Sequence, residues 1–401
     1  MSVHISCTIW KKGDLLGLSE LIDSADLVVV GSGFFGLTIA ERSAAHGLKV
    51  LVIEKRDHIG GNAYSYLDGY TGVEVHKYGS HLFHTSNETV WDYVNRFTEF
   101  NSYRHSVFAR HANKIYSMPI NLSTICNFFG EALSPIEARL LIESQVSNLK
   151  GSIPSNFEEK AISLVGKPLY EAFYFGYTSK QWGMHPSELP AEIVNRLPVR
   201  YDFNGRYFSD TWEGLPLKGY ANWFAEMVKS PNIQIALSTD FFEIKSQIDP
   251  SKLVVYTGAI DKFFDYKHGL LGWRTLDFEI ESLECDDFQG TSVVNYSDLK
   301  TPYTRIHEFK HLHPERNHKI GVTTIMKEFS RVGTRTDDPY YPINSSVDRQ
   351  ALLKYRERAK EEVNYIFGGR LGSYQYLDMH MAIASALQIF ENEIRPRMDL
   401  K

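Results

Sequence analysis

The first regular hydrophobic pattern begins at Asp26, where short apolar runs flank a longer amphipathic stretch. Leu27–Val30 and Val50–Ile53 are continuous apolar runs of four residues, typical of strands buried on both faces. Between them, Leu and Ala recur at helical spacing until the chain reaches Gly47. The pattern predicts a strand, a helix and a second strand, the beginning of a parallel α/β unit.

Three glycines occupy the turn between the first strand and the helix. Gly31, Gly33 and Gly36 form a G-x-G-x-x-G motif. The first glycine makes the turn, the second lets a pyrophosphate approach the backbone, and the third lets the helix pack closely on the strand. Glu54 follows the second strand, where a carboxylate can accept hydrogen bonds from ribose hydroxyls. The unit predicts a dinucleotide site.

The residues after Glu54 indicate which dinucleotide binds. Lys55 follows the acid, and a glycine pair ending at Gly61 precedes Asn62. An acid, a basic residue and a Gly-Gly pair resemble the FAD signature of the amine-oxidase and glutathione-reductase-like flavoproteins. Backbone N–H groups of such a pair can face the cofactor's phosphates. We therefore expect FAD rather than a nicotinamide cofactor.

Two later segments extend the expected cofactor domain. An apolar strand runs into Thr257 and Gly258, like the late strand that returns to the FAD domain in those families. Near the end of the chain, Arg370 lies in a glycine-rich turn and Asp378 is the expected N-cap of a helix that begins at Met379. The positive end of that helix could face the flavin carbonyl oxygens, although an ordinary terminal helix capped by Asp has the same pattern.

The remaining patterns set the expected fold class. Helical spacing dominates residues 100–182, and strand-like alternation returns over 270–330. We expect an α/β protein: a discontinuous Rossmann-like FAD-binding domain with a helical insert domain and an antiparallel β-sheet domain. The expected boundaries are 1–25 for an N-terminal extension; 26–95, 220–260 and 340–401 for the FAD-binding domain; 96–185 for a helical substrate and dimer domain; and 186–219 with 261–339 for the sheet domain, with a mobile loop near 183–199.

Composition narrows the function classes. The 401 residues carry 43 Lys and Arg against 49 Asp and Glu, a net charge of −6, which argues against nucleic acid as a partner. Three scattered cysteines, Cys7, Cys126 and Cys285, give neither a disulfide framework nor a metal site. No apolar run is long enough to span a membrane, and no signal peptide is evident. We expect a cytoplasmic protein without a bound metal.

Aromatic and arginine residues cluster in the middle of the chain. Tyr170, Phe173 and Tyr177 are spaced to share one helical face, which fits either a core stripe or a stacking platform. Thr178 and Trp182 at the polar end of that segment favour the platform. Two arginines, Arg196 and Arg305, recur near tyrosines, and guanidinium groups with tyrosine hydroxyls suit a diphosphate.

Several separated strings together resemble one family. VGSGFFGLTIAER, HIGGNAY, EVHKYGSHLFHT, EAFYFGYTSKQW, NRLPVRY, YTRIHEFKH, PYYPIN and GRLGSYQYLDMHMAIASAL look like those of bacterial UDP-galactopyranose mutases. The resemblance runs from Asp26 to about Phe390. It implies an isomerase that interconverts UDP-galactopyranose and UDP-galactofuranose, for cell-wall and surface polysaccharides, through an adduct of galactose with N5 of reduced FAD. It also implies a homodimer, with NAD(P)H as the external reductant.

The resemblance also assigns roles to individual residues. Arg196 and Arg305 should hold the diphosphate and stabilise the departing UDP, with Tyr341 and Tyr376 donating to the phosphates. His81 should lie against the flavin, although a core histidine bonded to backbone is its alternative. The expected uridine site consists of Phe173, Tyr177, Thr178, Trp182, Tyr207 and Asn295.

Two other functions share some of these features. A flavin oxidoreductase of the amine-oxidase type would have the same Glu54 and Gly-Gly pair, but it would need an apolar cage rather than arginines and tyrosines for a polyanion. A non-catalytic nucleotide-sugar sensor on the same fold is the third possibility.

Overall fold

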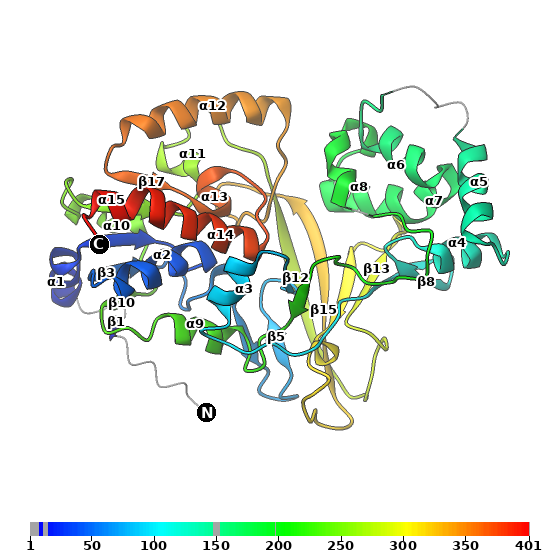
Figure 1. The fold of residues 1–401 in the computed structure, drawn as a ribbon, viewed down its shortest axis with the longest axis horizontal. Helices are drawn as coiled ribbons and strands as arrows, with labels where there is room; N and C mark the ends of the chain where they lie inside the picture. Colours follow the sequence, from blue (N-terminus) through cyan, green and yellow to red (C-terminus); the bar gives the residue numbers. More distant parts are fainter. Residues whose placement is uncertain (1–7, 11–14, 147–152, 197, 401) are drawn as a thin grey trace.

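The chain forms two lobes connected by long strands (Figure 1). The computed structural model describes residues 8–10, 15–146, 153–196 and 198–400. One lobe contains both ends of the described chain, and the other consists largely of helices from the middle of the sequence. Strands β12 (Trp273–Leu283) and β15 (Thr323–Val332) run between the lobes.

The first lobe is built on a parallel sheet whose central strands are buried on both faces. Its six strands in the described residues are, in spatial order, β1 (Thr8–Trp10), β10 (Ile233–Ala236), β3 (Val50–Ile53), β2 (Leu27–Val30), β11 (Leu253–Tyr256) and β17 (Tyr365–Phe367). Along β2, Leu27 and Val29 enter one hydrophobic core while Val28 and Val30 enter the other. Successive side chains point to opposite faces, so a continuous apolar run satisfies both cores.

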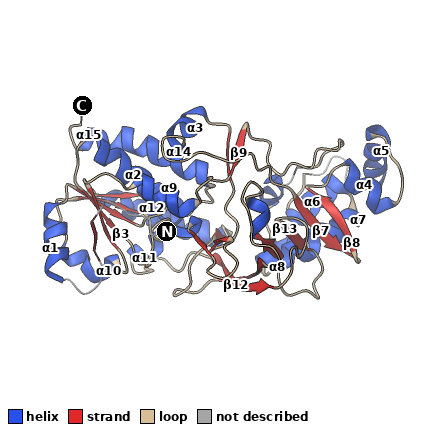
Figure 2. Ribbon diagram, turned by 90° about the horizontal axis from the view of Figure 1, so that it is seen from below, coloured by secondary structure: helices blue, strands red, loops and turns tan. Residues whose placement is uncertain are grey.

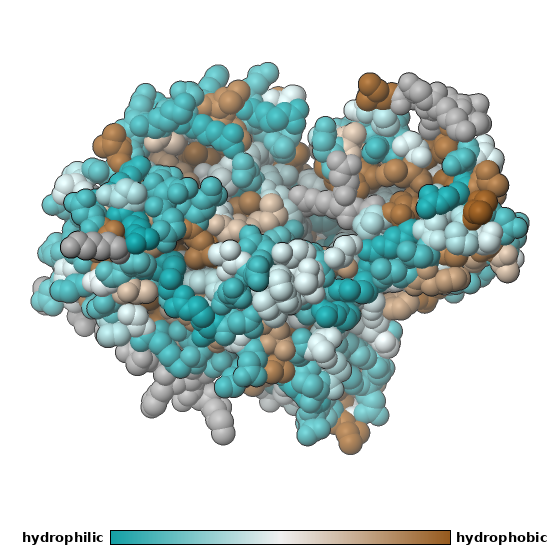
Figure 3. All heavy atoms as spheres, viewed as in Figure 1, coloured by the Kyte–Doolittle hydropathy of each residue, from teal (hydrophilic) through white to brown (hydrophobic). Residues whose placement is uncertain are grey.

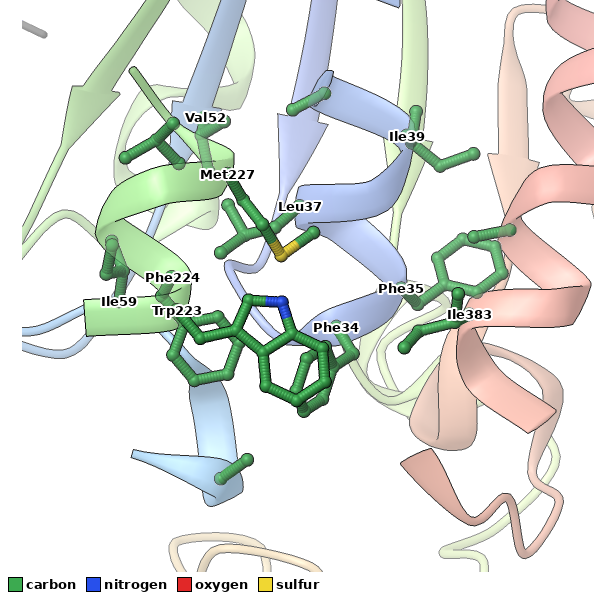
Figure 4. Close-up of a cluster of buried hydrophobic side chains, with 14 of the residues drawn as sticks. Phe34, Phe35, Leu37, Ile39, Val52, Ile59, Trp223, Phe224, Met227 and Ile383 are labelled. Atoms are coloured by element: carbon green, nitrogen blue, oxygen red, sulfur yellow. The ribbon is translucent and has the colours of Figure 1, made fainter. Parts of the chain in front are cut away.

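Helices cover both faces of this sheet (Figure 2). The helices of this lobe are α1 (Leu15–Ser24), α2 (Phe34–Ala45), α3 (Glu88–Val94), α9 (Tyr220–Met227), α10 (Phe241–Ile244), α11 (Ile260–Phe263), α12 (Ser346–Glu361), α13 (Gly369–Ser373), α14 (Met379–Ile389) and α15 (Arg395–Arg397). In the core of one face, Phe34 of α2 contacts Trp223 and Phe224 of α9 with ring centroids 4.7 Å apart in both pairs (Figure 4). On its other side, α2 packs against α14.

The N-terminal segment belongs to this sheet, which the sequence did not reveal. Strand β1 pairs in parallel with β10 at the sheet edge, and Trp10 is buried in the core. Leu18 and Ile22 of α1 are buried in the same core. A strand of three residues shows no alternation long enough to detect, so residues 1–25 were expected only as an extension of unknown use.

The second sheet forms the base of the site. Its seven strands in the described residues are β16 (Tyr341–Pro342), β12, β15, β14 (Arg305–Glu308), β13 (Val293–Tyr296), β7 (Val107–His111) and β8 (Lys114–Met118). Most pairs are antiparallel, whereas β13 and β7 are parallel. Strands β7 and β8 come from a stretch expected to be mainly helical, because their short hairpin is flanked by stronger helical patterns. Two small sheets pair β4 (Ser65–Leu67) with β5 (Glu74–His76) and β6 (Phe83–Thr85) with β9 (Trp212–Gly214).

The helices of the second lobe are α4 (Leu122–Phe129), α5 (Pro135–Gln145), α6 (Phe157–Val165), α7 (Lys167–Leu169), the π-helix η3 (Tyr170–Phe175), α8 (Gly176–Trp182) and the 3-10 helix η5 (Ala191–Arg196). In this lobe, α4 packs against β8 and η3 against β7, and the other helices pack on one another or on β15. Helical spacing in the sequence predicts a continuous helix through this part of residues 100–182. The structure breaks it at Gly166, whose φ of +79° favours glycine. In the described part of the chain, no helix combines the length and apolarity needed to cross a bilayer.

The contact between α2 and β2 gives a test of the fold. A Cβ at Gly36 would lie 2.0 Å from the Gly31 carbonyl oxygen and 3.3 Å from Val29 Cγ1. Gly36→Ala should therefore lower the free energy of unfolding by about 1–3 kcal/mol, because strain outweighs the better helix propensity of alanine. Urea unfolding followed by circular dichroism measures the change. Gly69→Ala is the control, since its Cβ would meet no atom within 4 Å; equal stabilities of the two variants would contradict the prediction.

Candidate active site

Two cavities adjoin between the lobes. One, of about 580 Å³, lies over the carboxyl ends of the parallel strands, and the other, of about 310 Å³, is bounded by the second sheet and α8. Both are lined by His81, Arg370 and Met379. The space-filling view shows the surface hollowed between the lobes (Figure 3). A ligand in one cavity can therefore meet a ligand in the other at these three residues.

The larger cavity contains the glycine-rich turn. A Cβ on Gly31 would collide with Thr257 Oγ1 at 2.1 Å, whereas a Cβ on Gly33 would meet no atom within 4 Å. Gly33, which lines this cavity, is the N-cap residue of α2, and no side chain caps that helix. The N–H groups of the first turn are thus available to an anion, as a dinucleotide pyrophosphate requires.

Glu54 stands at the end of β3 on the wall of the same cavity. Its Oε2 accepts hydrogen bonds from the Ser32 amide at 2.9 Å and the Ser32 hydroxyl at 2.6 Å. Its Oε1 accepts one from the Arg56 amide at 2.9 Å. Because a carboxylate has about four acceptor positions, Glu54 retains capacity for a ribose hydroxyl.

The other expected cofactor residues surround this cavity. Lys55 pairs with Asp338 at 2.6 Å, and Arg56 donates to Asn62 at 2.9 Å and to Asp338 at 2.7 Å. These contacts hold the segment around Asp338 against the cavity. The remaining expected residues on its wall are Gly36, Gly61, Thr257, Gly258, Arg370 and Met379. A cavity of about 580 Å³ with an uncapped helix terminus and a carboxylate that can still accept fits a dinucleotide.

His81 lies where the cavities meet, between β5 and β6. Its Nδ1 donates to the Gly79 carbonyl oxygen at 2.7 Å, since a carbonyl can only accept. Its backbone amide donates to His76 Nδ1 at 3.0 Å. Burial lowers the pKa of His81 to about 4, so the ring is neutral near pH 7 and offers Nε2 as an acceptor.

The N-terminus of α14 faces the same junction. Asp378 is the N-cap residue, as the sequence predicted, but its side chain makes no capping hydrogen bond. The residue lines the smaller cavity rather than the larger one. Arg370 donates to the carbonyl oxygens of Leu377 at 2.6 Å and Tyr340 at 3.2 Å, so it braces the chain on both sides of the junction.

Strand register creates a polar row in the smaller cavity. Arg305 on β14 is paired with Asn295 on β13 and with Glu328 on β15. Residues directly opposite each other in an antiparallel sheet point to the same face. All three side chains line the cavity, and the buried Asn295 Oδ1 has no hydrogen-bond partner in the structure. An unpaired buried oxygen is costly and is satisfied by a donor on a ligand.

Arg305 is held on two sides. Its Nε lies 3.3 Å from Glu328 Oε1, and its Nη2 donates to the Tyr177 hydroxyl. Burial opposes its charge, but Glu328 raises the pKa of Arg305 above its usual value. The side chain is 27% exposed, whereas that of Glu328 is 3% exposed. A fixed, charged and accessible guanidinium suits a phosphate.

The aromatic segment contains both a core face and a cavity face. Phe173 is buried against Tyr116, with ring centroids 5.0 Å apart, yet it lines the cavity with Tyr177, Thr178 and Trp182. Tyr170 lies in the core and does not line the cavity. Tyr170 and Phe173 share one core cluster, which fits the core alternative, while Phe173 and Tyr177 also reach the cavity.

Of the other predicted substrate residues, the tyrosines are found at the smaller cavity, whereas the position of the Arg196 side chain is not described. Tyr207, Tyr341 and Tyr376 line the smaller cavity, and the rings of Tyr341 and Tyr376 stack with centroids 5.9 Å apart. Arg196 ends η5, but its side chain lies outside the described residues.

The polar residues of the site that the sequence did not indicate include Ser80, Gln181, His307 and Glu328. His307 could have been found, because it lies two residues after Arg305 on the same strand and therefore on the same face. Glu328 reaches Arg305 only through pairing between strands that are separated in sequence, which no local pattern reveals.

Comparisons with known proteins agree with this geometry. A sequence profile of the UDP-galactopyranose mutase family matches residues 172–376, and a profile of NAD(P)-binding Rossmann-like domains matches residues 29–97. The first match covers the polar row, the aromatic segment and the stacked tyrosines. The second covers the glycine-rich turn and Glu54.

Similar proteins span nearly the whole chain. A Klebsiella pneumoniae protein described as a probable UDP-galactopyranose mutase is 44% identical, covering 92% of this chain and 94% of its own. An Escherichia coli dTDP-fucopyranose mutase is 43% identical, covering 90% and 96%. A Mycoplasma genitalium UDP-galactopyranose mutase is 32% identical, covering 92% and 94%.

Comparison with solved structures shows a similar fold in the same family. A crystal structure of a reduced UDP-galactopyranose mutase superimposes with a TM-score of 0.71 over 94% of this chain and 96% of its own, at 15% identity. The profile match and the extent of the similarity to the Klebsiella protein decide the assignment: this chain belongs to the UDP-galactopyranose mutase family.

Proposed function

We propose that this protein is an isomerase that interconverts UDP-galactopyranose and UDP-galactofuranose with FAD in the larger cavity. The observation that carries the proposal is the junction of the two cavities at His81, Arg370 and Met379, beside a row of groups suited to a diphosphate. The uncapped α2 terminus and Glu54 support the cofactor, and Arg305 with the tyrosines supports the nucleotide sugar. An oxidase would need a purely apolar cage, whereas Asn295, Arg305 and Glu328 line this cavity.

Reduced flavin would supply a nucleophilic nitrogen to the anomeric carbon without net oxidation. The chain's own residues would position the substrate and stabilise charge. Arg305 would bind the diphosphate and offset the charge that develops as UDP departs. Trp182 and Tyr177 offer aromatic faces to the base, and Asn295 Oδ1 can accept from a ribose hydroxyl. Neutral His81 would place a hydrogen-bond acceptor at the junction without adding charge.

The proposal also covers the reductant, the oligomeric state and the cellular role. NAD(P)H is the proposed external reductant, as the resemblance to the UDP-galactopyranose mutase family implies. A homodimer is supported by the exposed Ile136 and Leu140 on α5, which are 71% and 59% exposed. The protein would work in the cytoplasm and supply galactofuranose for cell-wall or surface polysaccharide. Arg196 remains part of the proposed diphosphate site.

The direct test is an assay in which chromatography measures the conversion of UDP-galactofuranose to UDP-galactopyranose. We expect turnover with dithionite-reduced protein, none with oxidised protein, and no oxygen consumption. Binding without conversion would favour a sensor, and oxygen consumption would favour an oxidase. dTDP-fucofuranose is tested in parallel because of the Escherichia coli relative. A higher kcat/KM for that compound would contradict the proposed substrate.

Gly33→Val tests the position of the cofactor. The backbone at Gly33 is extended, with φ of −71° and ψ of 177°, and its Cβ would enter open space in the cavity. We expect a folded protein with less than a tenth of the wild-type flavin content, because the side chain occupies the space needed by the pyrophosphate. Flavin absorbance per protein and the thermal midpoint are the measurements. Gly69→Val, outside both cavities, is the control; full flavin content in Gly33→Val would contradict the placement.

Arg305→Ala tests the diphosphate site. Loss of a donor that stabilises developing charge costs about 3 kcal/mol, so turnover with reduced flavin should fall roughly a hundredfold. Lysine at this position keeps the charge but not the planar fork and should restore only part of the rate. Arg395→Ala, which removes a surface pair with Glu391, is the control. Near-wild-type kcat in Arg305→Ala with retained FAD would contradict the assigned role.

A further inference from the structure

A series of polar contacts runs along the wall of the smaller cavity, from Arg305 to the turn that carries His81. Glu328 Oε1 lies 3.3 Å from Arg305 Nε, and its Oε2 lies 3.2 Å from His307 Nε2. On the far side of the imidazole, His307 Nδ1 lies 2.7 Å from Ser80 Oγ. His307 and Glu328 are almost fully buried, and Ser80 directly precedes His81.

The protonation states determine which group donates the proton in each of these contacts. Burial alone would raise the pKa of Glu328, but Arg305 and His307 lower it to about 2, so the carboxylate is ionised near pH 7. A carboxylate only accepts, so His307 Nε2 carries the proton of the imidazole. Burial lowers the pKa of His307, which keeps the ring neutral and makes Nδ1 an acceptor for the Ser80 hydroxyl. Arg305 forms an ion pair with Glu328, His307 donates to Glu328, and Ser80 donates to His307.

The arrangement fixes the orientation of the guanidinium. Arg305 Nε forms an ion pair with Glu328, and Nη2 donates to Tyr177, while the residue lines the cavity. Thr304 Oγ1 also donates to Glu328 Oε1, at 3.1 Å. Since Glu328 itself is anchored from both sides, Arg305 cannot rotate without breaking contacts that extend to the His81 turn.

We propose that Glu328 is a positioning residue, which orients Arg305 toward the diphosphate and, through His307 and Ser80, couples that orientation to the His81 turn at the junction of the two cavities. The inference rests on the proposed function, because it concerns the same reaction. Glu328 acts through Arg305 and the turn rather than on the reacting atoms.

Removing the charge of Glu328 distinguishes a positioning role from a purely structural one. The carboxylate partly offsets the positive charge that Arg305 presents to a dianionic ligand. Replacing it with neutral glutamine removes that offset, so attraction for UDP is kept or increased. The same change loosens the guanidinium, and turnover depends on accurate placement of that group. Binding and catalysis should therefore respond differently.

The experiment compares wild-type protein, Glu328→Gln, Ser80→Ala and the control Glu281→Gln, all with bound FAD. Glu281 is matched to Glu328 as a strand carboxylate paired with a cation, Lys327, but its side chain is 42% exposed. Titration calorimetry gives Kd for UDP, and the reduced-flavin assay gives kcat. For Glu328→Gln we expect Kd no higher than wild type and kcat at least tenfold lower. For Ser80→Ala we expect kcat lowered about threefold or more at unchanged Kd, and for Glu281→Gln no change.

Results other than these would contradict the positioning role of Glu328, the coupling to the His81 turn or the proposed function. Wild-type kcat in Glu328→Gln, or loss of UDP affinity in parallel with kcat, would overturn the positioning role. If Glu328→Gln does not fold, Ser80→Ala decides, because unchanged kcat there would overturn the coupling to the His81 turn. A wild-type protein that binds UDP but shows no turnover would overturn the proposed function and this inference with it.

Discussion

The pairing register of β13, β14 and β15 is the constraint on which the site depends. It places Asn295, Arg305 and Glu328 in one row on the cavity face. Because side chains alternate along a strand, a slip of one residue would turn Arg305 away from the cavity. Apolar residues maintain this register: Ile306, between Arg305 and His307, is buried in the core on the opposite side. Packing of one face thus determines the chemistry of the other.

In the first lobe, too, packed apolar residues hold in place the backbone that forms the site. Val28 and Val29 anchor β2 in two different cores, and the strand ends where the glycine-rich turn begins. Helix α2 is held at its start by ring contacts of Phe34 with α9 and packs against α14, while its N-terminus carries no side-chain cap. Rigid packing supports a helix end whose polar groups are available to an anion.

Local patterns revealed much of this architecture because the relevant signals are short in range. The strand, the three glycines, the helix and Glu54 lie within 30 residues, and each has its own physical signature. Strand β1 was missed because three residues give no periodicity, and the π-helix was missed because its shift in spacing is invisible in composition. The position of Asp378 was predicted, but not the absence of a capping hydrogen bond.

The site is harder to read than the fold because its polar groups meet through tertiary pairing. Arg305 and Glu328 are separated by 22 intervening residues and come together only when β14 and β15 pair. A sequence can identify an arginine with the right neighbours, yet it cannot say which carboxylate orients it. Burial then gives that pairing its strength, because water that would screen the charges is largely excluded around Glu328. The orientation of the guanidinium is therefore a property of the folded sheet rather than of any motif.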